Sequence, residues 1–161
     1  MARHVVIADL TAEAFAAFGD LIALKDRPDQ IINQGFCGRH HDLACLDFTQ
    51  GRAGISLFKA VPRSLPYNLE MMERHPLGSQ AFIPMTADPF LVIVAPDNSG
   101  APGMPVAFRV PTGMGVNFHR NTWHGVLTPL AEPGLFAVVD RIGDGDNLEE
   151  HWFEEAYEIA D

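Results

Sequence analysis

Hydrophobic and polar residues alternate along short segments of this chain, which is the pattern of β-strands. Between residues 55 and 61 side chains two positions apart share a face, which places Ile55, Leu57, Lys59 and Val61 together. Residues 90–95, Phe-Leu-Val-Ile-Val-Ala, are apolar without interruption. A run of this length is typical of a strand that is covered on both faces. Further strands are predicted over residues 5–7, 21–24, 106–110, 116–119, 124–127 and 135–140.

Helical patterns are confined to the two ends of the chain. Near the start, Thr11 can cap a helix over residues 12–18, and Gly19 provides the stop. The acidic tail fits either a strand over residues 148–153 or a helix over residues 149–157. Its aromatic residues predict that it packs against another surface, for which a second subunit is one candidate.

Many short strands with one short helix near the N-terminus predict a mainly all-β fold. The chain has 14 glycines and 12 prolines, spread along the sequence, which suits the frequent turns of a sandwich or barrel. Eight-stranded jelly-roll barrels, whose mouths hold small ligands, belong to this class. A length of 161 residues without a repeat or linker predicts a single domain over residues 1–161.

Charge and hydropathy exclude several classes of function. A net charge of −10 argues against general nucleic-acid binding, which requires surface cations. No apolar run approaches the roughly 20 residues of a membrane span. The N-terminal residues lack the layout of a signal peptide, so we expect a cytoplasmic protein.

A first group of polar residues lies in the segment Glu-Arg-His-Pro-Leu-Gly-Ser-Gln-Ala-Phe-Ile-Pro-Met, residues 73–85. Glu73 and His75 share a face of a strand that the turn residues after His75 break. The chain resumes at Gln80, so a carboxylate, an imidazole and an amide can meet. Arg74 points to the opposite face of an ideal strand. The alternative is an ordinary hairpin corner that faces solvent.

A second group lies in Gly-Val-Asn-Phe-His-Arg-Asn-Thr-Trp-His, residues 115–124. Asn117 and His119 share a face, and His124 follows a turn. Neutral imidazole binds divalent metals and can act as a base near neutral pH. Two such corners predict a site to which His75 and His124 each contribute a side chain.

Both segments resemble the two signature regions of the bacterial ureidoglycolate lyase family, and Arg39-His-His-Asp-Leu-Ala and Asp140-Arg141 fit the same pattern. The resemblance implies a cupin-type double-stranded β-helix and a homodimer. It implies cleavage of (S)-ureidoglycolate to glyoxylate and urea in allantoin catabolism. A divalent metal, nickel in members with an assigned metal, is also implied, with no organic cofactor.

Against the general cupin pattern, Glu73, His75 and Gln80 stand where two histidines and a glutamate are usual, and His124 resembles the histidine of the second motif. These four residues form the candidate metal set, although an amide binds divalent ions less well than a carboxylate. The candidate catalytic residues are His124, His119, His75 and Lys59. The candidate substrate-binding residues are Arg39, Arg74, Asn117 and Arg141.

Two alternatives to the lyase remain open at this point. The chain could be a metal-dependent cupin enzyme that acts on another small carboxylic acid. It could also be a non-catalytic cupin that binds a small molecule.

Overall fold

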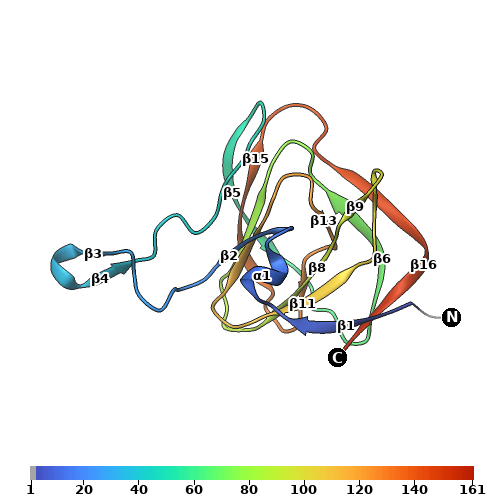
Figure 1. Ribbon diagram of the computed structural model, residues 1–161, viewed down its shortest axis with the longest axis horizontal. Helices are drawn as coiled ribbons and strands as arrows, with labels where there is room; N and C mark the ends of the chain where they lie inside the picture. The colour runs from blue at the N-terminus through green and yellow to red at the C-terminus, as the bar shows by residue number, and fades with distance from the viewer. Residues whose placement is uncertain (1–2) are drawn as a thin grey trace.

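Short strands follow one another along almost the whole chain in the computed structural model, which describes residues 3–161 (Figure 1). The larger sheet has the order β11-β1-β16-β6-β13-β8-β14, and β11 also pairs with β8. The ring of β8, β11, β1, β16, β6 and β13 is therefore a closed barrel of six strands. The seven strands of this sheet are β1 (Arg3–Asp9), β6 (Tyr67–Arg74), β8 (Phe90–Ala95), β11 (Val106–Val110), β13 (Trp123–His124), β14 (Thr128–Pro129) and β16 (Glu149–Ala160), of which β14 lies outside the ring. The prediction of an all-β barrel with a short N-terminal helix is confirmed.

A second, antiparallel sheet has the order β2-β12-β7-β15-β5. Its strands are β2 (Gly19–Ile22), β5 (Arg52–Lys59), β7 (Gln80–Pro84), β12 (Gly115–Phe118) and β15 (Leu135–Ile142). We call these two layers the barrel sheet and the second sheet. Both contribute to one apolar core, which contains the alternate β8 residues Phe90, Val92 and Val94. The remaining β8 residues Leu91, Ile93 and Ala95 belong to a core inside the barrel, so β8 is covered on both faces as predicted.

The N-terminal helix is shorter than the sequence predicts. Helix α1 spans Ala12–Phe15, and the Thr11 hydroxyl caps it by accepting a hydrogen bond from the Ala14 backbone N–H at 3.1 Å. The predicted end at residue 18 is wrong because the chain turns at once into β2. A Cβ on Gly19 would lie 1.9 Å from the Asn117 carbonyl oxygen, so only glycine allows β2 to approach β12 this closely.

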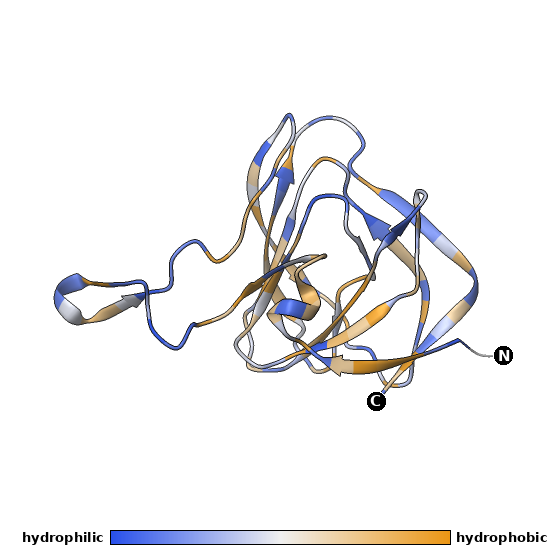
Figure 2. Ribbon diagram, viewed as in Figure 1, coloured by the Kyte–Doolittle hydropathy of each residue, from blue (hydrophilic) through white to orange (hydrophobic). Residues whose placement is uncertain are grey.

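The C-terminal tail is a strand rather than a helix. β16 continues from Glu149 to Ala160 and pairs with β6 and β1, with an irregularity between Trp152 and Tyr157. Its first half is drawn mostly in the hydrophilic colours of Figure 2, because only one of its faces reaches the core.

The connection over residues 96–105 contains a small hairpin. Strands β9 (Asp97–Asn98) and β10 (Ala101–Pro102) pair around Ser99 and Gly100, which both have positive φ. Asp97 accepts a hydrogen bond from the Gly100 N–H at 3.1 Å, which closes this turn.

Strand β5 presents its apolar face to the outside. Ile55 and Leu57 are 78% and 65% exposed, and Lys59 is exposed beside them. Phe58, on the opposite face, packs edge to face on Phe82 in the core, with ring centroids 5.9 Å apart. The alternation over residues 55–61 therefore predicts the strand correctly but does not show which face is buried.

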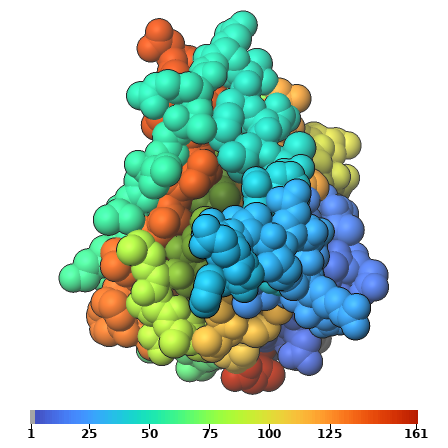
Figure 3. Space-filling model, turned by 90° about the vertical axis from the view of Figure 1, so that its left-hand side faces the viewer, coloured from blue at the N-terminus to red at the C-terminus, as the bar shows by residue number. Residues whose placement is uncertain are grey.

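A hairpin projects from the side of the second sheet (Figure 1, left; Figure 3, blue, toward the viewer). It consists of β3 (Gln30–Ile32), a 3-10 turn (Asn33–Gly35) and β4 (Cys37–Arg39). We call residues 25–44 the arm. Its large apolar side chains are exposed, with Phe36 at 91% and Ile31 at 63%. Among residues 3–161, no helix has the length and apolar character needed to cross a membrane.

Candidate functional site

Glu73, His75 and His124 lie together at the edge of the space between the two sheets. His124 on β13 is the direct cross-strand partner of Glu73 on β6, and His75 follows the end of β6. One carboxylate oxygen and one ring nitrogen of each histidine all lie within 4.8 Å of one another. The two imidazole centroids are 5.2 Å apart, and His75 Nε2 is 3.8 Å from Glu73 Oε1. The structure therefore brings residues of the two corners together, and we call these three residues the histidine cluster.

Backbone carbonyls determine the tautomer of both histidines. His75 Nδ1 is 2.7 Å from the Asn147 carbonyl oxygen, and His124 Nδ1 is 2.9 Å from the Gly125 carbonyl oxygen. A carbonyl oxygen only accepts, so each Nδ1 carries the hydrogen and each Nε2 of a neutral ring has a free lone pair. Both Nε2 atoms are buried without a hydrogen-bond partner among the described residues. A histidine that donates through one nitrogen to a carbonyl is typically a metal ligand or proton acceptor through the other.

Burial keeps His124 uncharged. Burial, followed by repulsion from the charge of His75, lowers the pKa of His124 to about 3, and the hydrogen bond to Gly125 offsets only part of this. The ring stacks face to face on Phe118, with centroids 4.5 Å apart. At neutral pH His124 therefore provides a lone pair and no positive charge. Burial also raises the pKa of Glu73, the charge of His75 opposes this change, and Glu150 adds to it.

An amide and a second carboxylate extend the site toward the second sheet. Gln80 begins β7 opposite Phe118 of β12, on the face that looks into the core. It is 7% exposed, and its Nε2 donates to Asp140 Oδ2 at 3.2 Å. The Gln80 Oε1 atom is buried without a partner among the described residues.

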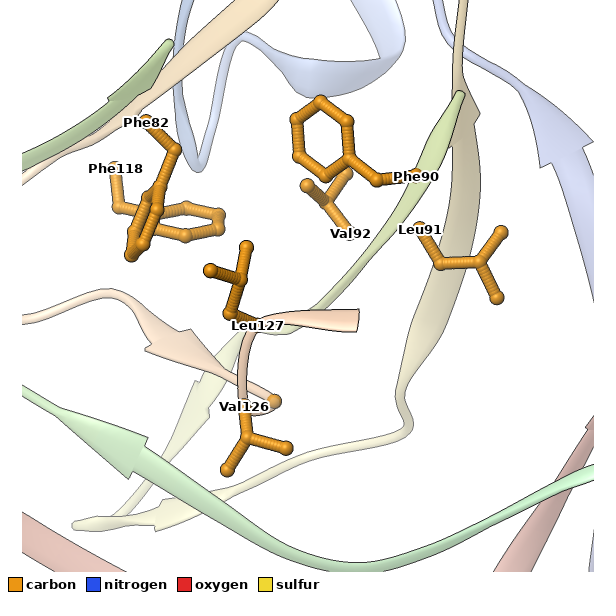
Figure 4. Close-up of a pocket in the computed structure, with 8 residues that line it drawn as sticks. Phe82, Phe90, Leu91, Val92, Phe118, Val126 and Leu127 are labelled. Atoms are coloured by element: carbon orange, nitrogen blue, oxygen red, sulfur yellow. The ribbon is translucent and has the colours of Figure 1, made fainter. Parts of the chain in front are cut away.

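Apolar side chains fill the space between the sheets beyond this site. A cavity beside Phe118 has a volume of only ≈ 10 Å³ and is lined mainly by Phe82, Phe90, Val92 and Leu127 (Figure 4). That volume is about enough for one water molecule. The apolar cavity itself is therefore too small for an organic ligand.

Asn117 and His119 form a separate polar cluster. They share a face as predicted, but it is the outer face of the second sheet, away from the histidine cluster, because the residue between them, Phe118, points inward. Asn117 Nδ2 donates to Asp20 Oδ2 and to the Cys45 carbonyl, both at 3.0 Å, and His119 Nε2 is 3.1 Å from Asp20 Oδ1. Burial would raise the pKa of Asp20, but hydrogen bonds from Asn117, the Cys45 N–H and His119 together hold it below its usual value.

Arg74 points away from the histidine cluster, as the strand alternation predicts. It binds Glu149 at 2.6 Å and Asp97 at 2.9 Å, and its guanidinium lies 4.5 Å from the centroid of Trp123. These contacts join β6 to β16 and to the β9 hairpin.

The other candidate cations also lie apart from the cluster. Arg141 is 7% exposed and donates to the carbonyls of Thr49, Gln50 and Asp144 at 2.6–2.9 Å. Arg39 is on the arm, and Lys59 is on the outer face of the second sheet. The structure therefore does not bring any of these cations together with Glu73, His75 and His124 within one chain.

From the sequence, Asp140 was named only as part of the pair Asp140-Arg141 that resembles the family pattern. Its neighbours two and four positions earlier, Val138 and Phe136, are buried in the core between the sheets. The predicted strand over residues 135–140 therefore contained the signal, because Asp140 shares the face of these residues. Asn147, whose carbonyl orients His75, could not be found in this way because it lies in a loop far along the chain.

Known proteins of one family match this chain over nearly its whole length. A sequence model of the ureidoglycolate lyase family matches residues 2–160. A protein from Rhodobacter capsulatus named ureidoglycolate lyase is 60% identical over 150 residues, which cover 92% of this chain and 93% of that protein. One of the same name from Chelativorans is 52% identical and covers 98% and 96% of the two chains. Ureidoglycolate lyase 2 of Rhizobium meliloti is 51% identical and covers 95% of each.

Proposed function

Because this chain belongs to the ureidoglycolate lyase family, we propose that it cleaves (S)-ureidoglycolate to glyoxylate and urea in allantoin catabolism, at the histidine cluster. The family match spans nearly the whole chain, which supports a single domain. The observation that carries the placement is the pair of buried, unpartnered Nε2 atoms of His75 and His124 beside the Glu73 carboxylate. Buried polar atoms without partners cost free energy, so such atoms mark a place where a ligand completes the structure.

The chemistry needs a group that takes a proton. Ureidoglycolate has one carbon that bears a hydroxyl, a carboxylate and a urea nitrogen. As the hydroxyl proton leaves, the oxygen lone pair forms the aldehyde of glyoxylate, the C–N bond breaks, and the nitrogen gains a proton to give urea. We propose that the Nε2 lone pairs of His75 and His124 act on this hydroxyl, either by accepting its hydrogen bond directly or, where they hold a divalent metal ion, through the ion, which would make the hydroxyl more acidic. The apolar wall at Phe118 excludes water from one side of the reacting carbon.

The donor set also fits a divalent metal ion. Two neutral imidazoles and one carboxylate, each in reach of a common point, form a ligand set that suits first-row divalent metals. Glu73, His75 and His124 would hold the ion, with the Asn147 and Gly125 carbonyls orienting the two rings. A bound ion would supply positive charge for the substrate oxygens, which matters because Arg39, Lys59, Arg74 and Arg141 all lie apart from the cluster. Gln80 is the weakest member of the expected set, and nickel stays a prediction.

Glu73→Gln is expected to weaken binding of a divalent metal by about 10-fold or more, because an amide oxygen is a poorer ligand than a carboxylate. Calorimetric titration of chelator-treated protein with Ni²⁺ measures this directly. Glu70→Gln, at an exposed position of the same strand, is the matched control and should bind like the wild type. Equal affinities for all three proteins would remove Glu73 from the metal set.

Incubating the purified protein with (S)-ureidoglycolate, with and without added Ni²⁺, tests the reaction itself. We expect urea and glyoxylate in equal amounts and no ammonia, because cleavage releases urea intact. Ammonia in place of urea would indicate hydrolysis of the ureido group instead. No turnover under either condition would contradict the proposed function, and tight binding without turnover would identify a small-molecule-binding protein.

We also propose that two copies form a homodimer through the outer face of the second sheet and the arm. Side chains that are cross-strand neighbours on β5, β15 and β7 form this face, and none of them is a carboxylate. They are Ile55, Leu57, Lys59, Ala81, Ile83, Leu135, Ala137 and Val139. Ile55, Leu57 and Ile83 are 78%, 65% and 39% exposed. Contiguous exposed apolar patches on a sheet are typical of protein interfaces.

The arm supports a second copy of this chain as the occupant of that face. A two-stranded hairpin is marginally stable alone, so an arm with Phe36 and Ile31 exposed needs a surface to pack on. The whole chain carries a net charge of −10, but the arm has three basic and three acidic residues and is therefore neutral. A neutral arm is not repelled by an apolar face whose single charge is that of Lys59. Arm and face lie on the same side of the molecule, so a two-fold axis can bring each to its counterpart.

Leu57→Asp is expected to convert the dimer to a monomer, because it places a charge in the centre of a desolvated interface. Light scattering after size exclusion should give twice the chain mass of 17.7 kDa for the wild type and a single chain mass for the variant. Trp152→Asp, at a 63% exposed position on β16 outside this face, is the control and should stay dimeric. The reverse pattern would place the interface at the C-terminal strand.

The cytoplasmic location expected from the N-terminal sequence stays a prediction.

A further inference from the structure

The polar groups that converge beside Phe118 are almost all hydrogen-bond acceptors. His75 Nε2, His124 Nε2 and Gln80 Oε1 are buried without partners among the described residues, and Glu73 adds a carboxylate. These groups therefore need positive charge at the histidine cluster, which a divalent metal ion would supply, and a hydrogen-bond donor at Gln80 Oε1. The ureido group of ureidoglycolate carries three N–H donors on two nitrogens.

Asp140 determines which end of the Gln80 amide faces this pocket. An amide side chain can be turned round, but a carboxylate only accepts hydrogen bonds, so the NH₂ of Gln80 must face Asp140. The carbonyl oxygen of Gln80 is thereby held at the opposite end, with no protein donor in reach. Gln80 lies opposite Phe118, whose ring stacks on His124, so Phe118 connects this amide to the histidine cluster.

We propose that Asp140 is a positioning residue, which holds the Gln80 amide so that its Oε1 accepts a hydrogen bond from a ureido N–H of the substrate. This inference rests on the proposed function and assigns the ureido end of the substrate to the second sheet. The carboxylate and hydroxyl end is then left to the histidine cluster on the barrel sheet, where a divalent metal ion held by Glu73, His75 and His124 would supply the positive charge. The substrate lies across the gap between the two sheets, and its C–N bond lies between the two groups of side chains.

Two ligands that are not cleaved separate the two ends of the substrate. N-carbamoylglycine has the ureido group and the carboxylate but no hydroxyl, and glyoxylate has no ureido group. In Asp140→Asn the new amide can donate to Gln80 Oε1 and turn the Gln80 amide round, which replaces an acceptor with a donor. Calorimetry on the metal-loaded protein should show N-carbamoylglycine bound about tenfold more weakly, and glyoxylate within about twofold of the wild type.

A double variant that exchanges the amide and the carboxylate between positions 80 and 140 is the control for a purely structural effect. Gln80→Glu alone places two carboxylates side by side and should also weaken N-carbamoylglycine by about tenfold. With Gln80→Glu and Asp140→Asn together, the asparagine NH₂ can hold the glutamate, whose other oxygen again accepts, so affinity should return to within about threefold of the wild type.

Unchanged N-carbamoylglycine affinity in Asp140→Asn would overturn the inference, and so would an equal loss for glyoxylate. A double variant as weak as either single variant would overturn it as well. Any of these outcomes, together with normal release of urea by the wild-type protein, would leave the proposed function standing. Absence of that release would instead remove the function and, with it, the assignment of the ureido end.

Discussion

His124→Ala should reduce the release of urea from ureidoglycolate by at least about 100-fold, because it removes one of the two Nε2 lone pairs that we propose act on the substrate hydroxyl, directly or through a metal ion. His124 is the most deeply buried member of the histidine cluster, at 2% exposure, and its Nε2 is one of the two free lone pairs. The variant should remain folded, because the side chain contributes only one hydrogen bond, to its neighbour Gly125. Initial rates and far-ultraviolet circular dichroism measure the two effects separately.

His119→Ala is the matched control for that experiment. His119 is five residues earlier but lies on the outer face of the second sheet, bound to Asp20. We expect its turnover to stay within about twofold of the wild type, because surface substitutions away from a site have small effects. Near-normal turnover in His124→Ala, or an equal loss in both variants, would contradict the placement of the site.

Phe15→Ala should lower the free energy of unfolding by about 3–5 kcal/mol, the usual cost of truncating a buried phenylalanine to alanine. The Phe15 side chain is fully buried and packs edge to face on Phe108, with ring centroids 6.1 Å apart. The Phe15 and Phe118 ring centroids are 6.2 Å apart, so truncating Phe15 would open a cavity beside the ring that stacks on His124. Urea unfolding at a fixed protein concentration measures the loss, which is a large share of the roughly 5–15 kcal/mol of a typical domain.

Met104→Ala provides the comparison, because this side chain is 58% exposed in the loop that precedes β11. Its effect should stay within about 0.5 kcal/mol. An equally small loss of unfolding free energy in Phe15→Ala would mean that the helix contributes little to the stability of the core.

The sequence predicted the positions of the strands better than it predicted which face of each strand is buried. Residues 90–95 were identified as a doubly covered strand because an unbroken apolar run has few other solutions. β5 was found but its buried face was not, since Ile55 and Leu57 make the exposed face look like a core face. Such a pattern is misleading when an exposed face is itself apolar, as at a proposed interface between subunits. The helix after Thr11 was expected to be too long because the close approach of Gly19 to Asn117 is a tertiary contact.

The site residues on strands were predictable from the alternation of side chains between the two faces. Those in turns and loops were not. Glu73 and His75 were placed together because they are two apart, and His124 joined them through a cross-strand pair. His119 and Lys59 could not be separated from the site by type or spacing, because only the choice of buried face decides their position. The carbonyls of Asn147 and Gly125, which set both tautomers, have no signal in side-chain chemistry.

The most direct test of the account is a crystal structure of the metal-loaded protein with N-carbamoylglycine bound. We predict that the ligand lies between the two sheets on the polar side of Phe118. Its carboxylate should be next to the histidine cluster, and a ureido N–H should be within hydrogen-bonding distance of Gln80 Oε1. Ligand bound instead at the Asp20 and His119 cluster, on the outer face of the second sheet, would contradict the central claim.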